Sequence, residues 1–506
     1  MKRSIIIGSI IVSLFIIIAL NYLSKSKTIP LNSAIANRKI ELIECPLDLD
    51  IPNGEKVECG YLIVPENRSN RDRDIKIFFA RVVGYEQDVT TKPLVYLAGG
   101  PGEGGSTYLT ERMEQFFALR RSRDLIVIDQ RGTGFSLPRL DCDTKADAME
   151  ELKLSLSECL KQYQQENIDL TGYNTTESAK DLQELRQALK IDRWNLIATS
   201  YGTRLAQEVM RIDPDGIRSV VLNSTLPTFD SFFSPSLAAD QKRIFEQMFA
   251  DCAADPECDR AFPNLRQVFL SIEGKIDGKV LKLSSQNRSA IITFNKFVSL
   301  LESKLEKTTT IPQIPLLVWS MAESIDGNAT ATSLIANVFS SDDIPEHLVK
   351  SVPLQKNVQK ADGLNIAVIC HEDWSWIDNW NKLKRQIAAY KPFVSISPLI
   401  RYEIACPMWN VGKADADFQA KVVSDIPTLM LTGNYDRLTA PMWTEEVAEG
   451  LSNSQIVRFK GIGHDVIDAS LCAKALTADF IANPNESLPL DCVERMRAPE
   501  FITELP

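Results

Sequence analysis

The chain has 506 residues, of which 44% are hydrophobic and 24% are charged, and its formal net charge is -11. A chain of this length and composition buries a large core, so a disordered or fibrous protein is excluded. The acidic balance, with no dense block of lysine and arginine in the globular part, argues against a nucleic-acid partner.

Residues 1–30 form a segment that precedes the globular part. Two cations at the start are followed by an apolar run over 5–23. A membrane span needs about 20 apolar residues, whereas the apolar part of a secretory signal is about 7 to 15 residues long. A possible cleavage motif, Ala34-Ile35-Ala36, lies well past that run. We therefore expect an uncleaved membrane anchor, with a cleaved signal peptide as the alternative, and a globular part facing the periplasm or the extracellular side.

Ten cysteines are spread along the chain, and none of them forms a CxxC pair. An even number of cysteines in an exported chain is typical of disulfides formed in an oxidising compartment. The simplest arrangement pairs neighbours in chain order, although the sequence alone leaves the connectivity open. A metal site would need clustered thiolates and imidazoles, and only three histidines are present, so no metal is expected. The cysteines are Cys45, Cys59, Cys142, Cys159, Cys252, Cys258, Cys370, Cys406, Cys472 and Cys492.

Short apolar runs alternate with helical patterns in the first part of the core, residues 31–228. The runs PLVYLAGG, DLIVIDQ, WNLIATS and SVVLNS are typical of strands that are buried on both faces. Thr175 opens a segment in which apolar residues recur at helical spacing. The alternation predicts an α/β fold with a parallel sheet and helices on both of its faces.

The alternation stops after residue 228, and residues 229–417 have mostly helical patterns. Strand-like runs return in residues 418–506 with PTLMLTG and SQIVRF. The chain is therefore predicted to have an interrupted α/β core with a large, mainly helical lid insertion.

Ser200 is the candidate nucleophile. It lies in ATSYG, which differs from the GxSxG pattern only in having Ala198 in place of the first glycine. The serine follows a predicted strand and precedes a predicted helix, where the helix dipole favours developing negative charge. By itself this near-match favours the alternative, an ordinary hydroxyl at a strand-to-helix turn, and the assignment depends on the motifs in the rest of the chain.

A serine nucleophile needs a base, and His464 follows a core strand on a glycine-flanked loop, whereas His347 and His371 fall within the insertion. A carboxylate must orient the base, and Asp436 also follows a core strand. The alternative role for Asp436 is a turn or helix cap. Asp465 is a weaker candidate because a side chain adjacent to the histidine seldom points back at the ring. The order serine, aspartate, histidine is that of α/β-hydrolases.

The site also needs donors for an oxyanion. We expect the backbone N–H of Tyr201 to be one and that of Gly100, in the glycine-rich stretch YLAGGPGEGG, to be the other. This stretch lacks the GKS or GKT ending of a phosphate-binding loop and the GxGxxG spacing, so no nucleotide cofactor is expected.

The motifs GGPG, DQRGTG, SYG, GNYD and GIGH together resemble the α/β-hydrolases of the proline iminopeptidase and tripeptidyl aminopeptidase group over roughly residues 40–500. The resemblance implies an α/β-hydrolase fold with a lid, and a triad of Ser200, Asp436 and His464 with Gly100 in the oxyanion hole. It implies no metal or organic cofactor. Ala198 and Ala98, which stands where many relatives have histidine, depart from the pattern.

An enzyme that recognises the free amino terminus of a peptide needs a carboxylate to bind the ammonium group, and we expect this carboxylate in the lid insertion. The stretch AVICHEDWSW resembles a segment of related lids, and we expect Glu372 to serve; the alternative is a solvated acidic pair with Asp373. Arg131 in DQRG is expected to hold its loop by its fork of donors.

We therefore expect an exported serine hydrolase that takes a peptide as its partner and removes residues from its amino end. The alternatives are a carboxylesterase or lipase-like enzyme with the same triad, and a catalytically silent binding protein of the same fold. The sequence leaves the oligomeric state open.

Overall fold

The computed structural model describes residues 39–86, 91–142, 144, 149–276, 278–285, 288–340, 360–395 and 399–504. The expected anchor over 5–23 lies outside these ranges, as does His347. Within the part of the chain that is described, no helix is both long enough and apolar enough to cross a membrane.

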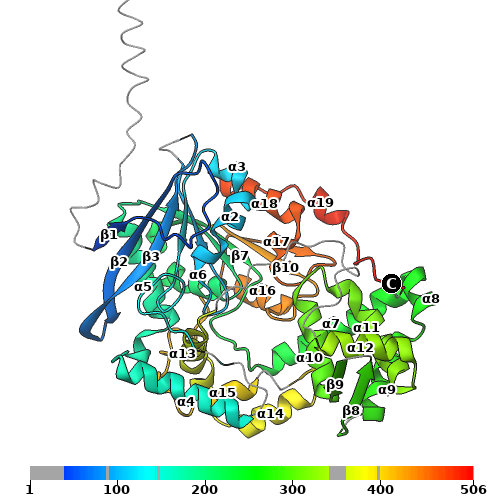
Figure 1. The fold of residues 1–506 in the computed structure, drawn as a ribbon. Helices are drawn as coiled ribbons and strands as arrows, with labels where there is room; N and C mark the ends of the chain where they lie inside the picture. Colours follow the sequence, from blue (N-terminus) through cyan, green and yellow to red (C-terminus); the bar gives the residue numbers. More distant parts are fainter. Residues whose placement is uncertain are drawn as a thin grey trace, which may run out of the picture.

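A nine-stranded sheet with the order β1-β2-β3-β5-β4-β6-β7-β10-β11 forms the core (Figure 1). The strands from β5 to β11 in this order run parallel to one another, which confirms the predicted parallel sheet. Every residue of β4, β5, β6 and β10 is buried, because helices cover both faces of the sheet. The parallel strands are β4 (Leu94–Leu97), β5 (Leu125–Ile128), β6 (Trp194–Thr199), β7 (Ile217–Asn223), β10 (Thr428–Gly433) and β11 (Ser454–Phe459).

Three antiparallel strands at the sheet's amino-terminal edge were not predicted. They are β1 (Ile40–Ile43), β2 (Val57–Asn67) and β3 (Asn70–Val82), and β3 pairs antiparallel with β5. Along β2, buried and half-buried residues alternate, as expected for a strand with one face on the core and one nearer solvent. The sheet is therefore mixed, with an antiparallel edge added to a parallel centre.

Helices from both parts of the core cover the two faces of the sheet. On one face α5, α6 and α16 pack against side chains such as Leu196 and Met430. On the other face α2, α3, α17 and α18 pack against Val127 and Leu431. The predicted helix from Thr175 is α5, and Asn174 caps it by accepting a hydrogen bond from the Glu177 N–H. The bounds are α2 (Leu109–Gln115), α3 (Phe117–Arg120), α5 (Thr175–Ala188), α6 (Tyr201–Ile212), α16 (Pro441–Ala448), α17 (Val466–Ala469), α18 (Leu471–Ala482) and α19 (Asp491–Glu494).

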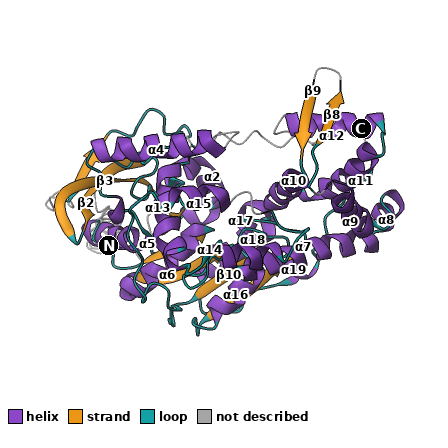
Figure 2. Ribbon diagram, turned by 90° about the horizontal axis from the view of Figure 1, so that it is seen from below, coloured by secondary structure: helices purple, strands orange, loops and turns teal. Residues whose placement is uncertain are grey.

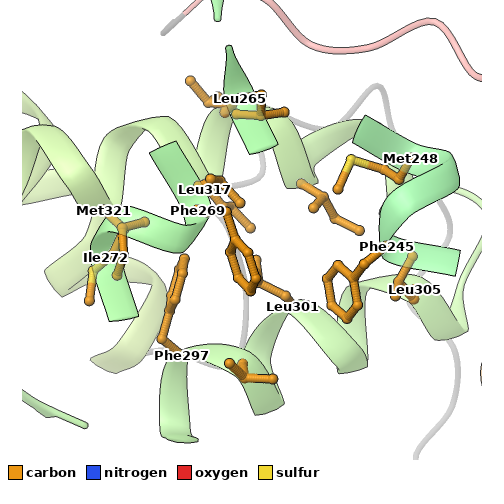
Figure 3. Packing of buried hydrophobic residues seen from close by; sticks show 14 of the residues in the cluster. Phe245, Met248, Leu265, Phe269, Ile272, Phe297, Leu301, Leu305, Leu317 and Met321 are labelled. Atoms are coloured by element: carbon orange, nitrogen blue, oxygen red, sulfur yellow. The ribbon is translucent and has the colours of Figure 1, made fainter. Parts of the chain in front are cut away.

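Between β7 and β10 the described chain adds no strand to the central sheet, and most of it is helical, as predicted. We call its first part, α7 to α12, the distal body. Its apolar core contains stacked phenylalanines such as Phe245 and Phe269 (Figure 3). A two-stranded hairpin in it was not predicted. The elements are α7 (Pro235–Ala254), α8 (Pro256–Ala261), α9 (Leu265–Ile276), β8 (Leu281–Ser285), β9 (Arg288–Ile292), α10 (Phe294–Glu306), α11 (Ile314–Ile325) and α12 (Ala329–Ser340).

The second part of the insertion packs separately from the distal body (Figure 2). Helices α13 (Asp362–Glu372) and α15 (Ile400–Ala405) pack with α4 (Met149–Gln165), which comes from the first part of the core. We call these three helices the proximal body. Helix α14 (Trp380–Ala388) joins the two bodies, because its Ile387 is buried in the core of the distal body and its Lys384 pairs with Glu403 of α15 at 2.6 Å. The predicted single lid therefore consists of two bodies with different cores.

The carboxyl-terminal tail returns to the distal body. Phe501 is buried in the core of that body, and the Ile502 N–H donates to the Pro312 carbonyl at 2.9 Å. Five disulfides join the cysteines in chain order, which confirms the simplest pairing. They are Cys45–Cys59, Cys142–Cys159, Cys252–Cys258, Cys370–Cys406 and Cys472–Cys492.

Candidate active site

Ser200 occupies the sharp turn between β6 and α6. Its backbone has φ 57° and ψ −126°, a region that non-glycine residues rarely adopt and that costs about 1 to 3 kcal/mol. A side chain at Gly202 would meet the Leu97 carbonyl oxygen at 2.3 Å, so only glycine fits there. Ala198 is fully buried in β6, and its methyl group is accommodated within the core. The departure from the glycine pattern therefore leaves the turn intact.

Asp436 and His464 lie together at the carboxyl ends of β10 and β11. His464 Nδ1 is 3.0 Å from each carboxylate oxygen of Asp436, which is fully buried. The Asp436 carboxylate also accepts the backbone N–H groups of Leu438 and Thr439 at 3.0 Å and the Thr439 hydroxyl at 2.7 Å. Thr439, which the sequence analysis missed, thus fixes the carboxylate that orients the histidine.

The two side chains shift each other's pKa. Burial raises the pKa of Asp436, but the attraction of His464 and the hydrogen bonds from His464 and Thr439 outweigh it, and the result lies below the ordinary value. Burial lowers the pKa of His464, and the charge of Asp436 outweighs it, so that pKa lies above the ordinary value. Asp436 therefore stays ionised and favours the imidazolium that a general base becomes.

Because Nδ1 of His464 is directed at Asp436, the other ring nitrogen, Nε2, is the one that can take up a proton. No hydrogen bond joins Ser200 Oγ to His464 in the described residues. Catalytic hydrogen bonds in ligand-free enzymes are often long and tighten only when substrate binds. The structure thus pairs the base with its carboxylate and presents the serine on a strained turn.

Asp465, the weaker candidate for the orienting carboxylate, turns away from the ring. It accepts a hydrogen bond from Asn223 Nδ2 at 2.6 Å and pairs with Arg112 Nη2 at 3.1 Å. Its backbone is left-handed, with φ 58°, and its N–H donates to Ser224 Oγ at 3.1 Å. Asp465 therefore fixes the backbone after His464, and Asp436 is the carboxylate that contacts the imidazole.

The glycine-rich loop lies directly against the nucleophile. A side chain at Gly99 would meet Ser200 Cβ at 3.1 Å, and Gly100 has a φ of +104° that favours glycine. Tyr201 is the first residue of α6, where helix N–H groups have no partner within the helix. Gly100 and Tyr201 thus flank Ser200, and their roles as oxyanion donors remain predictions.

Asp129 holds the glycine-rich loop in place through hydrogen bonds. Its buried carboxylate accepts the Ser106 N–H at 2.8 Å, the Ser106 hydroxyl at 2.7 Å and the Phe135 N–H at 2.7 Å. Side chains at Gly104 or Gly134 would collide with it. Burial raises the pKa of Asp129, so these donors are needed to keep the group satisfied.

Arg131 has the structural role that the sequence predicted. Its guanidinium is fully buried and grips Asp181 with Nε at 2.9 Å and Nη2 at 2.8 Å. Its Nη1 donates to the carbonyls of Glu66, at 2.6 Å, and Gly172. The fork therefore ties the DQRG loop to α5 and to β2.

Glu372 does not fit the predicted role of binding an amino terminus. Its side chain is 1% exposed, its Oε1 accepts the Thr175 N–H at 2.7 Å, and its Oε2 lies 3.5 Å from Arg204 Nη1. Asp373 shares Arg204 at 3.1 Å and is also buried, so the alternative of a solvated acidic pair is wrong. Burial raises the pKa of each carboxyl to about 7, although Arg204 lowers it. Glu372 instead braces α13 against α5 and α6.

The distal body holds the loops of Asp436 and His464. Arg437 donates its Nε to the Glu302 carbonyl at 2.7 Å and forms an ion pair with Glu306. The His464 N–H donates to the Glu306 carbonyl at 3.2 Å. These contacts could not be read from the sequence, because they join residues more than 100 positions apart.

The proximal body holds the glycine-rich loop. The Ala361 N–H donates to the Gly102 carbonyl at 2.9 Å, and Asn365 Nδ2 donates to the Pro101 carbonyl at 3.0 Å. A side chain at Gly102 would meet the Ala361 carbonyl oxygen at 2.7 Å, so the two backbones touch. His371 lies in this body with Nδ1 on the Val411 carbonyl at 2.7 Å, and burial lowers its pKa.

No group of three histidine, cysteine, aspartate or glutamate side chains in the described ranges is arranged to hold a metal ion. A strained serine after a parallel strand, with a histidine and a carboxylate after two later strands, is the arrangement of an α/β-hydrolase. The chain belongs to this family. A family model described as alpha/beta hydrolase fold matches residues 92–469.

Relatives of this chain include several hydrolases. YuaR of Escherichia coli (strain K12), whose name describes it as a hydrolase, is 23% identical over 86% of this chain and 87% of its own length. Tripeptidyl aminopeptidase of Streptomyces lividans is 25% identical, and serine protease Hip1 of Mycobacterium tuberculosis (strain ATCC 25618 / H37Rv) is 28% identical. These two matches span 43% and 41% of this chain and less than half of each relative, 44% and 43%.

Solved structures of the same fold also resemble the chain. An esterase from Thermogutta terrifontis has a TM-score of 0.37 at 13% identity and covers 84% of this chain and 99% of its own. Proline iminopeptidase of Mycobacterium smegmatis has a TM-score of 0.36 at 13% identity, with coverages of 84% and 98%. The family assignment rests on the family model.

Proposed function

We propose that this protein is an exported serine hydrolase that cleaves peptide bonds near the amino terminus of peptides through an acyl-enzyme. The observation that carries the proposal is the Asp436–His464 pair, whose carboxylate is fully buried, together with the strained backbone of Ser200 at the start of α6. The peptide specificity is supported by the names of the relatives, which include tripeptidyl aminopeptidase and proline iminopeptidase.

In the proposed reaction His464 takes the proton of Ser200 Oγ as the hydroxyl attacks the carbonyl carbon. Asp436 holds the ring and stabilises the imidazolium. The backbone N–H groups of Tyr201 and Gly100 bind the oxyanion, and one such donor contributes about 10²- to 10³-fold to the rate in a related case. The intermediate expels the amine with the proton from His464, and water then hydrolyses the ester on Ser200 by the same steps.

A fluorophosphonate probe tests the nucleophile. We expect it to label the wild-type protein at Ser200, and we expect Ser200→Ala to lose both labelling and about 10⁶-fold of the activity. Ser69→Ala, which changes an exposed serine, is the matched control and should be labelled like the wild type. A folded wild-type protein that resists the probe would instead be a catalytically silent binding protein.

A substrate panel tests the specificity. Peptidyl amides with a free amino terminus should be cleaved faster than the same amides with a blocked amino terminus. Activity on short acyl esters alone would reject the peptidase and leave the esterase alternative with the same triad.

The exported location is part of the proposal. Five disulfides among the described residues are typical of proteins that fold in an oxidising compartment. We propose that residues 5–23 anchor the chain to the membrane, and mass spectrometry of the amino terminus of protein from the membrane fraction tests this. Recovery of a chain that begins after residue 36 would show cleavage instead.

A further inference from the structure

Glu103 places a carboxylate beside the nucleophile, on the same loop as Gly100. The position that a Gly99 Cβ would occupy is 3.1 Å from Ser200 Cβ and 3.5 Å from Glu103 Oε2. The carboxylate oxygen and Ser200 Cβ therefore lie no farther apart than these two distances placed end to end. The side chain of Glu103 is 13% exposed, so it is largely shielded from solvent without being sealed in.

This carboxylate already receives an ammonium group and a hydroxyl group, and it can accept further hydrogen bonds. Lys360 Nζ lies 2.8 Å from Oε1, and the Tyr108 hydroxyl donates to Oε2 at 2.7 Å. A carboxylate has about four acceptor positions on its two oxygens, so two neighbours do not exhaust it. Glu103 thus differs from Glu372, which is 1% exposed and is held by Arg204 and the Thr175 N–H.

The distance from Ser200 to Glu103 can be compared with the distance between the attacked carbonyl and the α-ammonium group of a peptide. That second distance depends on how many residues are released. In an amino-terminal residue the amino nitrogen is two bonds from its own carbonyl carbon, about 2.5 Å away. An ammonium–carboxylate hydrogen bond adds about 2.8 Å. When three residues are released together, an extended chain puts the ammonium about 7 Å farther from the attacked carbonyl. A carboxylate this close to Ser200 therefore matches a free amino group on the residue whose carbonyl is attacked.

We propose that Glu103 binds the α-ammonium group of the substrate and so selects peptides from which a single amino-terminal residue is released. This inference rests on the proposed function, because it assumes that Ser200 attacks a peptide carbonyl. The substrate class is a peptide with a free amino terminus, held between Glu103 and the nucleophile. Glycine at position 99 lets the loop carrying Glu103 approach Ser200 this closely, because a Cβ there would lie only 3.1 Å from Ser200 Cβ.

The test compares three anilides: a single aminoacyl anilide, its N-acetyl form and a tripeptidyl anilide with a free amino terminus. The wild type should cleave the free aminoacyl anilide with the highest kcat/KM. Glu103→Gln should lower kcat/KM for that substrate by about 10- to 100-fold, because it removes a hydrogen bond to a charged group. It should change the N-acetyl anilide and the rate of fluorophosphonate labelling by less than about 3-fold, since neither presents an ammonium.

Lys360→Ala is the matched control, because it removes the ion pair with Glu103 but keeps the carboxylate. We expect it to retain the preference for a free amino group over an acetylated one. Equal losses of Glu103→Gln on the free and acetylated substrates, or loss of the preference in Lys360→Ala, would show that the pair only holds the loop and would overturn the inference.

Two further outcomes separate this inference from the proposed function. If the wild type prefers the tripeptidyl anilide and Glu103→Gln leaves that preference unchanged, the peptidase assignment stands and the single-residue inference fails. If the labelled wild type cleaves esters but none of the three anilides, the proposed function itself fails, and Glu103 has no ammonium to bind.

Discussion

The distal and proximal bodies of the insertion support different parts of the site. The distal body contacts the loops that carry Asp436 and His464, through Arg437 and the Glu306 carbonyl. The proximal body contacts the glycine-rich loop, through the Asn365 amide and the Ala361 backbone. One body thus bears on proton transfer and the other on the groups that surround the attacked carbonyl. Substitutions in the contacts of the two bodies should therefore have different effects on kcat and on its pH dependence.

The largest effect is expected on the side of the distal body, at the orienting carboxylate. Asp436→Asn should lower kcat by about 10⁴-fold, because the amide favours the wrong tautomer of His464. In the wild type the pKa of His464 lies above its ordinary value, so activity falls as pH decreases through that raised pKa. Loss of the Asp436 charge lowers the pKa of His464, and the acidic limb of the kcat/KM profile should move to lower pH. An unmoved limb would mean that another group is the base.

Thr439→Val should have a smaller effect of the same kind. It removes the hydroxyl that donates to Asp436 Oδ2 at 2.7 Å, and kcat should fall roughly 10-fold. Thr439→Ser keeps a hydroxyl and should recover most of the rate. Steady-state kinetics of both variants check this, and equal losses in the two would assign the effect to packing.

Asn365→Ala tests the side of the proximal body. It removes the hydrogen bond from Nδ2 to the Pro101 carbonyl, so the glycine-rich loop loses one support, and kcat should fall roughly 5-fold. The acidic limb of the pH profile should stay in place, since His464 is untouched. Asn381→Ala, at an exposed position on α14, is the control. A shifted limb in Asn365→Ala would show that the two bodies are not independent.

The last prediction concerns stability, at the place where the end of α13 meets Arg204 of α6. The pKa of Asp373 is raised to about 7 by burial, against Arg204, so the folded state binds more protons than the unfolded state between pH 4 and 7. The free energy of unfolding should therefore decrease as pH rises through this window. Asp373→Asn should make that decrease shallower by about 1 to 2 kcal/mol, measured by urea unfolding at pH 5 and pH 8. An identical slope in the variant would contradict the raised pKa.

The parallel centre of the sheet is predicted well, and the three triad positions are proposed, from local sequence pattern. A strand buried on both faces reads as a mostly apolar run, and Ser200 and Asp436 follow two such strands, β6 and β10, whereas His464 follows the partly buried β11. The alternating strand β2 mixes charged and apolar residues, and it was missed because its pattern is weaker.

The role of Glu372 could not be read from its neighbours in the sequence. Its burial depends on Arg204 and on the free N–H of Thr175, both more than 160 residues away. The division of the insertion into two bodies is likewise a matter of packing, since helical patterns continue through both. The sequence around Glu103 indicates only a glycine-rich loop and predicts no role for the side chain. Its position near Ser200 becomes visible only in the folded structure.

The return of the carboxyl-terminal tail has a mechanical consequence for the insertion. A mobile lid moves about one hinge. The distal body has several attachments instead, which include contacts with α14 and with Phe501 and Ile502 of the tail. We therefore expect the distal body to be held rigidly on the core. A movement away from the sheet would expose the Phe501 side chain and break the hydrogen bond from the Ile502 N–H to the Pro312 carbonyl. Removal of the tail residues that contact the distal body should therefore increase the mobility of the His464 loop, because that body supports the loop through the Glu306 carbonyl. No residue near Ser200 would be changed.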